Sequence, residues 1–278
     1  MKHRAVRLLV FSFLPLPLLV LSAFANSVNL GTAGSYAVLA GSAVTNTLAT
    51  TLSGDLGLSP STAYSGGGTI TFASGTTNIN NAAALQAQSD LTTGYLQAKN
   101  LASTDNLSGM DLGGQTLKTG VYSFTSSAGL ATGTTLTLTG TPGALFVFQV
   151  GSALTTGSGS SVIFINSLTG KPMTDPNIFW QIGSSATLGT STSFEGNILA
   201  LTSITLDTSA SITCGSALAQ NGAVTLQGNT ITNCGSSSGG TGISTVPEPG
   251  TVGMLGTGLI LLAGAAFRKM RHPLVVSR

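Results

Sequence analysis

Two stretches of this chain repeat each other: Thr187-Leu188-Gly189-Thr190-Ser191-Thr192-Ser193-Phe194 and Thr205-Leu206-Asp207-Thr208-Ser209-Ala210-Ser211-Ile212. When Thr187 is set against Thr205, their apolar, hydroxyl and small positions match one for one. A third copy starts at Thr225-Leu226-Gln227, a nearly equal distance further on, and residues 130–136 share the frame. Internal similarity at about 20 residues predicts a solenoid. Because no repeat holds a helix and glycine is abundant at the predicted corners, we expect a β-solenoid.

Short apolar runs recur along the rest of the chain. Residues 144–150 and 161–165 are two examples, and runs of this length predict buried strands. A disordered chain would be poorer in Ile, Leu, Val and Phe. We therefore expect one mainly β domain over residues 26–234. A flat β-sandwich is the alternative, but it does not explain the near-constant offset.

One segment has a helical pattern. Asn80 and Asn81 are candidate caps for a helix over about 81–99, a region rich in Ala, Leu and Gln. A single helix in a β protein must pack its apolar stripe on a sheet. The residues of this stripe are Ala84, Ala87, Leu91, Tyr95 and Ala98.

The composition between Asn26 and Val246 excludes most chemistry. This segment has no His and no Arg, and its three lysines and seven carboxylates give a charge of 3 − 7 = −4. Imidazole-based catalysis, zinc binding and nucleic-acid binding need residues that are missing here. We therefore expect no enzyme activity, no metal, no cofactor and no nucleic-acid partner. The charged residues are Lys99, Lys118, Lys171, Asp55, Asp90, Asp105, Asp111, Asp175, Glu195 and Asp207.

Residues 1–25 predict a secretory signal peptide. A basic segment over 1–7 precedes an apolar run over 8–21, and Ala23-Phe24-Ala25 is a small-x-small cleavage site. An uncleaved anchor helix is the alternative, although two prolines inside the run disfavour it. Cleavage by signal peptidase would start the mature chain at Asn26.

The other end resembles a PEP-type C-terminal sorting signal. A Gly/Ser-rich linker over 235–246 leads to Pro247-Glu248-Pro249, an apolar stretch over 252–267 and a basic cluster over 268–271. This stretch is short for a bilayer span, so alone it would be a weak membrane anchor. In families with this tail, an exosortase-type protease removes it and releases the protein outward. The resemblance implies transient membrane attachment through 247–278, then an extracellular or cell-surface location.

The two cysteines are predicted to form a disulfide. Cys214 and Cys234 have the same spacing in the sequence as Leu206 and Leu226, so they should lie on neighbouring turns. Strands that are about 4.7–4.9 Å apart suit the Cα separation of a disulfide. An exported protein also enters an oxidising compartment.

The domain resembles the microbial ice-binding (antifreeze) protein-like family over essentially all of residues 28–233. That family implies a discontinuous right-handed β-helix with one long α-helix packed alongside. The resemblance is carried by residues 30–40, 53–60, 146–152, 178–184, 194–200 and 219–226, for example Phe146-Val147-Phe148-Gln149-Val150-Gly151-Ser152 and Ala219-Gln220-Asn221-Gly222-Ala223-Val224-Thr225-Leu226.

Several members of that family bind ice through a flat β-face with Thr-(Ala/Gly)-x-(Thr/Asn) steps. Here Thr132-Gly133-Thr134-Thr135 fits the pattern, Thr156-Gly157 keeps its first half, and the repeats at Thr190 and Thr208 depart from it. Threonine is stiff at χ1, so it presents its hydroxyl and methyl groups at little entropic cost. The predicted ice-binding residues are Thr132, Thr134, Thr135, Thr156, Thr190, Thr192, Ser193, Thr208 and Ser211.

Three functions compete at this point. The first is an exported protein that adsorbs to ice, or to ordered water, and inhibits ice growth or recrystallisation. The second is a cell-surface or biofilm-matrix protein in contact with exopolysaccharide, which the sorting tail favours. The third is a sugar-cleaving enzyme with Glu195 and Trp180 in its site, but scattered carboxylates and a lone Trp argue against it.

Overall fold

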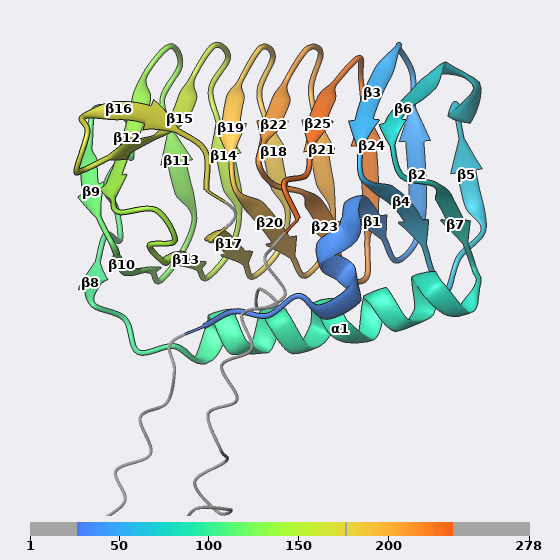
Figure 1. Cartoon of the computed structure of the whole chain (residues 1–278), viewed down its shortest axis with the longest axis horizontal. Coiled ribbons are helices and arrows are strands. Elements are labelled where there is room, and N and C mark those ends of the chain that lie inside the picture. The colour runs from blue at the N-terminus through green and yellow to red at the C-terminus, as the bar shows by residue number, and fades with distance from the viewer. Residues whose placement is uncertain (1–26, 176, 236–278) are drawn as a thin grey trace, which may run out of the picture. The chain divides into compact units, whose positions relative to one another are not determined.

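Three sheets form the body of the protein (Figure 1). The computed structural model describes residues 27–175 and 177–235, so the predicted signal peptide, most of the linker and the sorting tail lie outside the described residues. From β1 to β7, and again from β10 onward apart from β16, successive strands go to sheet A, sheet B and sheet C in turn, and each round of three makes one coil. All strand pairs in the described ranges are parallel except one. The predicted mainly β fold, a solenoid-like stack, is confirmed.

The strands of the three sheets follow in spatial order. Sheet A contains β7 (Thr77–Ile79), β4 (Asp55–Leu58), β1 (Tyr36–Ala40), β23 (Ala217–Ala219), β20 (Asn197–Ala200), β17 (Ile178–Ile182), β13 (Phe146–Val150), β10 (Gly120–Phe124) and β8 (Asp105–Asn106). Sheet B contains β5 (Ala63–Ser65), β2 (Ala43–Asn46), β24 (Ala223–Leu226), β21 (Ile204–Leu206), β18 (Ala186–Leu188), β14 (Leu154–Thr156) and β11 (Ala128–Leu130). Sheet C contains β6 (Ile70–Ser74), β3 (Thr50–Ser53), β25 (Thr230–Thr232), β22 (Ser211–Thr213), β19 (Ser193–Glu195), β15 (Ser161–Asn166), β12 (Thr135–Gly140) and β9 (Thr116–Lys118), with β16 (Lys171–Met173) paired antiparallel to β15.

The two ends of the described chain meet inside the stack. Strand β1 pairs with β23 on one side and β4 on the other, and β2 and β3 pair in the same way with β24 and β25. The first coil therefore lies between the last coil and the second coil. The chain crosses from the β5–β7 end to the β8–β9 end through the helix α1 (Ala82–Asn100), which runs along the stack (Figure 1).

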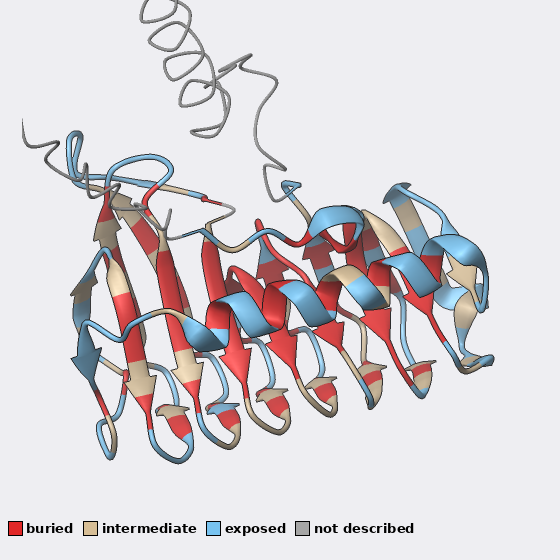
Figure 2. Cartoon of the chain, turned by 90° about the horizontal axis from the view of Figure 1, so that it is seen from below, coloured by how far each residue is buried: buried red, intermediate tan, exposed pale blue. Residues whose placement is uncertain are grey.

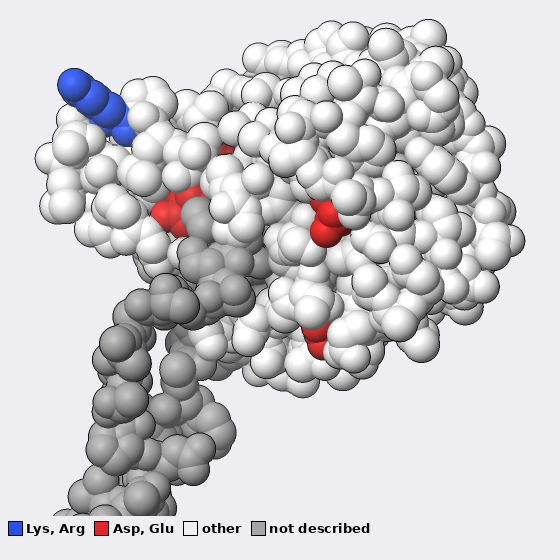
Figure 3. Space-filling view, turned by 45° about the vertical axis from the view of Figure 1, so that its right-hand side comes forward, with Lys and Arg blue, Asp and Glu red and all other residues white. Residues whose placement is uncertain are grey.

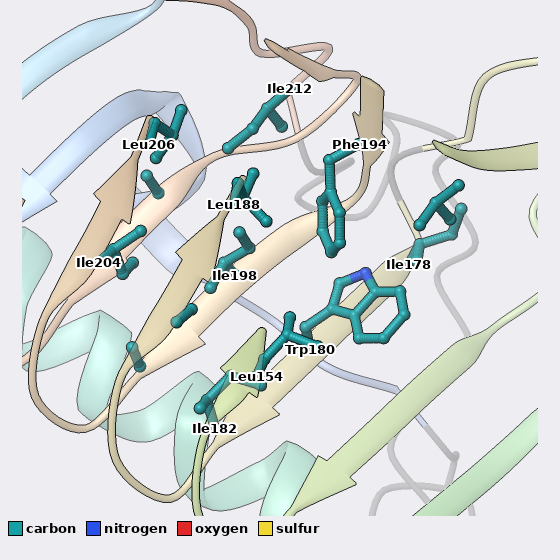
Figure 4. Close-up of a cluster of buried hydrophobic side chains, with 14 of the residues drawn as sticks. Leu154, Ile178, Trp180, Ile182, Leu188, Phe194, Ile198, Ile204, Leu206 and Ile212 are labelled. Carbon is teal, nitrogen blue, oxygen red and sulfur yellow. The ribbon is translucent and has the colours of Figure 1, made fainter. Parts of the chain in front are cut away.

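Along each strand, every second side chain points into the interior and fills it. Leu188, Leu206, Phe194 and Ile212 all point inward and are almost fully buried, as the repeat predicts (Figure 4). In sheet A, the in-register residues Tyr122, Phe148 and Trp180 stack, with ring centroids 5.5 and 3.8 Å apart. Aromatic rings and branched aliphatic side chains thus hold adjacent coils together by apolar burial.

Helix α1 covers the outer face of sheet A (Figure 2). The Asn81 side chain caps it by accepting a hydrogen bond from the N–H of Ala84 at 2.9 Å. At the other end, Gln149 Nε2 donates to the carbonyls of Ala98 and Leu101, both at 2.8 Å. The predicted stripe is buried, so sheet A is enclosed on both faces; its residues are Ala84, Ala87, Leu91, Tyr95 and Ala98. Two short 3-10 helices, η1 (Gly31–Ser35) and η2 (Gly67–Thr69), lie near the N-terminal coils.

Cys214 and Cys234 form a disulfide in the structure, with their Cα atoms 4.7 Å apart. They lie on neighbouring coils: Cys214 directly follows β22, and Cys234 is the second residue after β25. The register differs from the prediction by one position, because Thr213 pairs with Thr232, which would extend to Asn233 rather than Cys234 as the partner of Cys214. Cys214 has a positive φ of 51°, a local change of backbone direction that accompanies this difference.

Candidate functional site

Sheet B carries a straight row of threonines on its outer face. Five of them are consecutive partners in the strand register, with Gly129 at one end of the row and Ser65 at the other. Neighbouring strands are about 4.7–4.9 Å apart, so the five side chains cover a line of about 19 Å. We call this row the threonine ladder; it comprises Thr155, Thr187, Thr205, Thr225 and Thr45.

The alternation of each strand aims these side chains outward. In β18, Ala186 and Leu188 are buried and Thr187 between them is partly exposed. The same pattern holds in β21, where Ile204 and Leu206 flank Thr205. Because successive side chains of a strand point to opposite faces, apolar burial on the inside fixes the outward direction of each threonine.

The ladder hydroxyls are available to solvent or a ligand. None of the five hydroxyl groups forms a hydrogen bond with another residue in the described ranges. The serines beside the row differ, because Ser185 Oγ accepts from the N–H of Ser203 at 3.3 Å and Ser203 Oγ accepts from the N–H of Ala223 at 3.2 Å. The ladder is therefore a line of unpaired donors and acceptors on β-branched side chains with restricted χ1.

Sheet B is also the most regular of the three sheets. Its pairings contain no register shift, whereas β1–β4 in sheet A and β3–β6 in sheet C each contain one. In sheet C, β16 also pairs with β15, which leaves Ser161 with Ser193 as the one register pair between β15 and β19. Since α1 covers sheet A, sheet B is the regular face that stays open.

Sheet C has a second column of hydroxyl residues, but several of them are already engaged. Thr135 Oγ1 and Ser161 Oγ lie 2.8 Å apart, and Ser211 Oγ donates to the carbonyl of Thr192 at 3.4 Å. The β15–β16 pairing lies further along β15, at residues 164–166, so the column itself keeps its register. The members of the column are Thr135, Ser161, Ser193, Ser211, Thr230, Thr51 and Thr71.

The residues predicted from sequence do not form one face. Thr132, Thr190 and Thr208 are exposed, but they lie on the corner turns between sheets B and C. Thr134 precedes β12 and donates to the carbonyl of Ala131 at 2.6 Å, and Thr135, Ser193 and Ser211 belong to sheet C. Thr156 and Thr192 are buried and hydrogen-bonded to each other at 2.9 Å, so their placement on an exposed face was wrong.

A conformational requirement of the corner explains this error. In the Thr132-Gly133 turn the second residue has a φ of 67°, and Ser191 and Ser209 occupy the same corner position with φ values of 57° and 60°. The Thr-Gly pattern therefore reflects a turn that needs left-handed backbone. The ladder could have been found from the first residue of each repeat, because Thr187, Thr205 and Thr225 each precede an inward leucine.

The carboxylate and tryptophan considered for a sugar site lie in the interior. Trp180 is fully buried, and its Nε1 donates to the carbonyl of Glu195 at 3.1 Å. The Glu195 carboxylate accepts from the N–H of Asp175 at 2.9 Å and of Phe164 at 3.2 Å. Burial raises the pKa of Glu195 to about 7, against the opposing effect of these two donors. The Glu195 side chain borders a cavity of about 310 Å³ beside the β15–β16 hairpin.

Charged residues are sparse on this molecule. Figure 3 shows single acidic and basic side chains separated by wide uncharged areas on the face in view. Among the ladder strands β14, β18, β21, β24 and β2, no residue is charged, and Asp207 follows β21 at the edge of the face. In the described residues, no helix combines the length and the apolar character that a membrane crossing needs.

Fold and face together define a repeat protein with an open, uncharged row of hydroxyl groups on sheet B. The family model for ice-binding-like proteins matches residues 38–232, which is most of the chain. The chain therefore belongs to the ice-binding-like family. A PEP-CTERM protein-sorting motif matches residues 245–271, which marks an exported, extracellular or cell-surface protein.

Relatives and solved structures agree with this assignment. An ice-binding protein of Nostoc sp. (strain HG1) is 48% identical over 242 residues, covering 86% of each chain. An ice-binding protein of Flavobacterium frigoris (strain PS1) is 35% identical, covering 74% of this chain and 76% of the relative. The crystal structure of an ice binding protein from an Antarctic biological consortium has 42% identity and a TM-score of 0.67, covering 80% of this chain and 96% of that one. The ice-binding protein of Antarctomyces psychrotrophicus has 36% identity and a TM-score of 0.68, covering 74% and 98%.

Proposed function

We propose that this protein is an exported ice-binding protein whose ice-binding surface is the outer face of sheet B. The observation that carries the proposal is the threonine ladder, five in-register side chains whose hydroxyl groups are unbonded within the described protein. Relatives named as ice-binding proteins support the ligand class.

The proposed mechanism is the positioning of ordered water. The strand spacing sets the hydroxyl and methyl groups on a regular grid, and ice has lattice spacings of similar size. Water that bridges such fixed groups is bound almost as well as in a direct hydrogen bond. The ladder strands carry no charge, so no tightly held hydration shell competes with an ice-like layer. A seed crystal covered by such molecules would stop growing at the covered sites.

A pair of matched substitutions tests the face. Thr205→Tyr places a large ring in the middle of the ladder, while Thr51→Tyr places the same ring at an exposed, outward position of sheet C. Since both sites are on the surface, both variants should keep the parent melting temperature in circular dichroism. Thr205→Tyr should lose most of the thermal hysteresis and recrystallisation inhibition, and Thr51→Tyr should keep them. Equal activity of the two variants would remove sheet B as the site, and an inactive parent protein would remove ice binding itself.

We further propose the finer architecture and the processing that the resemblance implies. The coils would wind as a right-handed β-helix, the common hand for parallel crossovers, and the sequence discontinuity would lie where β1 pairs with β23. Signal peptidase would cut after Ala25, and an exosortase-type enzyme would remove the tail from about Val246 onward. Peptide mass spectrometry of surface and secreted material tests this, because mature protein should lack residues 268–278. Recovery of those residues would favour a permanent anchor.

A second candidate is a structural protein of the surface or matrix, supported by the sorting motif alone. It would contact exopolysaccharide and show no ice activity, and the assay above separates the two. We do not propose an enzyme, because the carboxylates of Glu195 and Asp175 already accept hydrogen bonds from backbone N–H groups.

A further inference from the structure

The two ends of the strand stack are finished differently. At one end, β5, β6 and β7 are the last strands of their sheets and pair on one side only within the described residues. We call residues 61–79, which contain these strands and η2, the terminal coil. At the other end, β8, β9 and β11 are last, and the loop between β8 and β9 buries Leu107 and Leu112 against the core.

The terminal coil leaves apolar side chains of the core incompletely covered. The core packs against six partly buried hydrophobic residues, and four of them belong to this coil. One other, Leu117, lies at the opposite end, and Met173 lies in the β15–β16 hairpin. The turn at η2 packs over Tyr64, so the coil is only partly capped. The four residues are Tyr64, Ile70, Phe72 and Ile79.

The two ends of the stack also differ in charge, and again the terminal coil is the less protected end. Residues 61–79 contain no charged residue and no proline, whereas the opposite end carries Asp105, Asp111 and Lys118. Natural sheets protect open edges with charges, prolines or covering segments, because unpaired N–H and C=O groups otherwise recruit another strand. One end of this stack has that protection and the terminal coil lacks it.

We propose that the terminal coil is a self-association surface whose partner is the terminal coil of a second copy of this chain. A second copy is the occupant that fits, because it offers three strand edges at the same three positions and a matching apolar centre. Other proteins could add a strand to one edge, but only a coil of the same cross-section meets all three together. Pairing these edges would cover Tyr64, Ile70, Phe72 and Ile79 on both copies.

The pairing is expected to be two-fold rather than head-to-tail. A head-to-tail contact would place the uncharged coil against the end that carries Asp105, Asp111 and Lys118, and it would continue into an open filament. A two-fold contact joins like with like and closes as a dimer. Edge strands related by a two-fold axis run antiparallel, so one of β5, β6 and β7 would pair with its own copy while each of the other two pairs with the other's copy in the partner.

Sedimentation velocity on the exported protein, recovered after expression of the full chain, tests the proposal. The parent protein should sediment with twice the mass of one mature chain at high concentration and dissociate on dilution. Ala63→Lys combined with Thr77→Lys puts exposed charges at the starts of β5 and β7, and should give a monomer at every concentration. Thr116→Lys is the matched control, an exposed edge position of β9 at the opposite end, and should leave the dimer intact. Melting curves of both variants, compared with the parent protein, check the fold.

Three outcomes would overturn the proposal. A parent protein that is monomeric throughout the concentration series contradicts it directly, and so does a dimer that only Thr116→Lys dissociates. Filaments of increasing length would replace the two-fold contact with head-to-tail assembly. Ice activity is measured separately, so a dimer without thermal hysteresis would refute the proposed function and leave the interface standing.

Discussion

Thr187 and Thr205 are direct partners in the parallel register of β18 and β21, on the solvent side of sheet B. The inward neighbours of both threonines are fully buried, so neither side chain can turn away from the surface without exposing the core. The same relationship extends to Thr155 on one side and to Thr225 and Thr45 on the other. A property of the interior, the period-two burial of aliphatic residues, therefore sets the geometry of the outer surface.

The corner threonines should matter little for ice binding. Thr190→Tyr and Thr208→Tyr enlarge residues on the turns between sheets B and C, outside the ladder, so each variant should keep most of the parent thermal hysteresis. Nanolitre osmometry at matched protein concentrations measures this, with Thr187→Tyr as the positive control for loss of activity. If the corner variants lose activity as fully as Thr187→Tyr does, the binding surface extends around the corner.

Glu195 should make stability fall as pH rises. Its pKa in the folded protein is about 7, above the ordinary value of 4.5, because it is buried. The folded state then binds more protons than the unfolded state between about pH 4.5 and 7, so the free energy of unfolding decreases across that window. The total change is about 3 kcal/mol, and it is complete about one pH unit above 7.

Urea unfolding at pH 4.5, 6 and 8 measures how the free energy of unfolding changes with pH, with Glu195→Gln as the comparison. The glutamine cannot ionise, so its pH dependence in this window should be flat. Its stability should also be lower at acidic pH, because one side-chain N–H₂ group then opposes a backbone N–H. A variant that keeps the parent slope would assign the titration to another group.

The serine at the corner between sheets B and C holds its backbone in the left-handed region, and this conformation costs stability that a glycine would not lose. Ser209 has a φ of 60° where other coils carry glycine, as at Gly133. Ser209→Gly should raise the free energy of unfolding by about 0.5–1 kcal/mol, the relief of left-handed strain less the added entropy of the unfolded chain. Ser158→Gly, at a corner residue that lacks the positive φ, should give no gain. Thermal melts of both variants decide this, and equal shifts would contradict the conformational explanation.

The disulfide should stabilise the C-terminal coil. Intact-mass analysis of exported protein before and after reduction should show the gain of two hydrogen atoms. Cys214→Ser combined with Cys234→Ser should lower the free energy of unfolding by about 3 kcal/mol for a loop of this length. Thermal hysteresis at low temperature should persist in the double variant, because neither cysteine lies on sheet B. Two free thiols in the exported protein would be the contrary result.

The repeat in the sequence predicted the coils and the inward residues because apolar alternation is a local signal. The helix stripe was predicted for the same reason, since Ala84 to Ala98 follow one face of α1. The grouping of the threonines on one face was mistaken because the direction of a threonine depends on where the strand ends and the corner begins. Thr190 and Thr208 lie beyond that point, and the left-handed φ of Ser191 and Ser209 that marks it is a three-dimensional property. The β16 insertion, which interrupts sheet C, has no counterpart in the other coils.

The crossing of α1 along the whole of sheet A limits how this protein can change in length. Most solenoids grow or shrink by duplicating or deleting one repeat, since each repeat contacts only its neighbours. Here the 19 residues of α1 span about 28 Å and must reach from the coil after β7 to the coil before β10. An added coil would push these ends apart by about 4.8 Å and would require about three more helical residues at the same time. The length of α1 therefore matches the present number of coils, and a gene duplication confined to one repeat would leave the helix about three residues short for the longer stack.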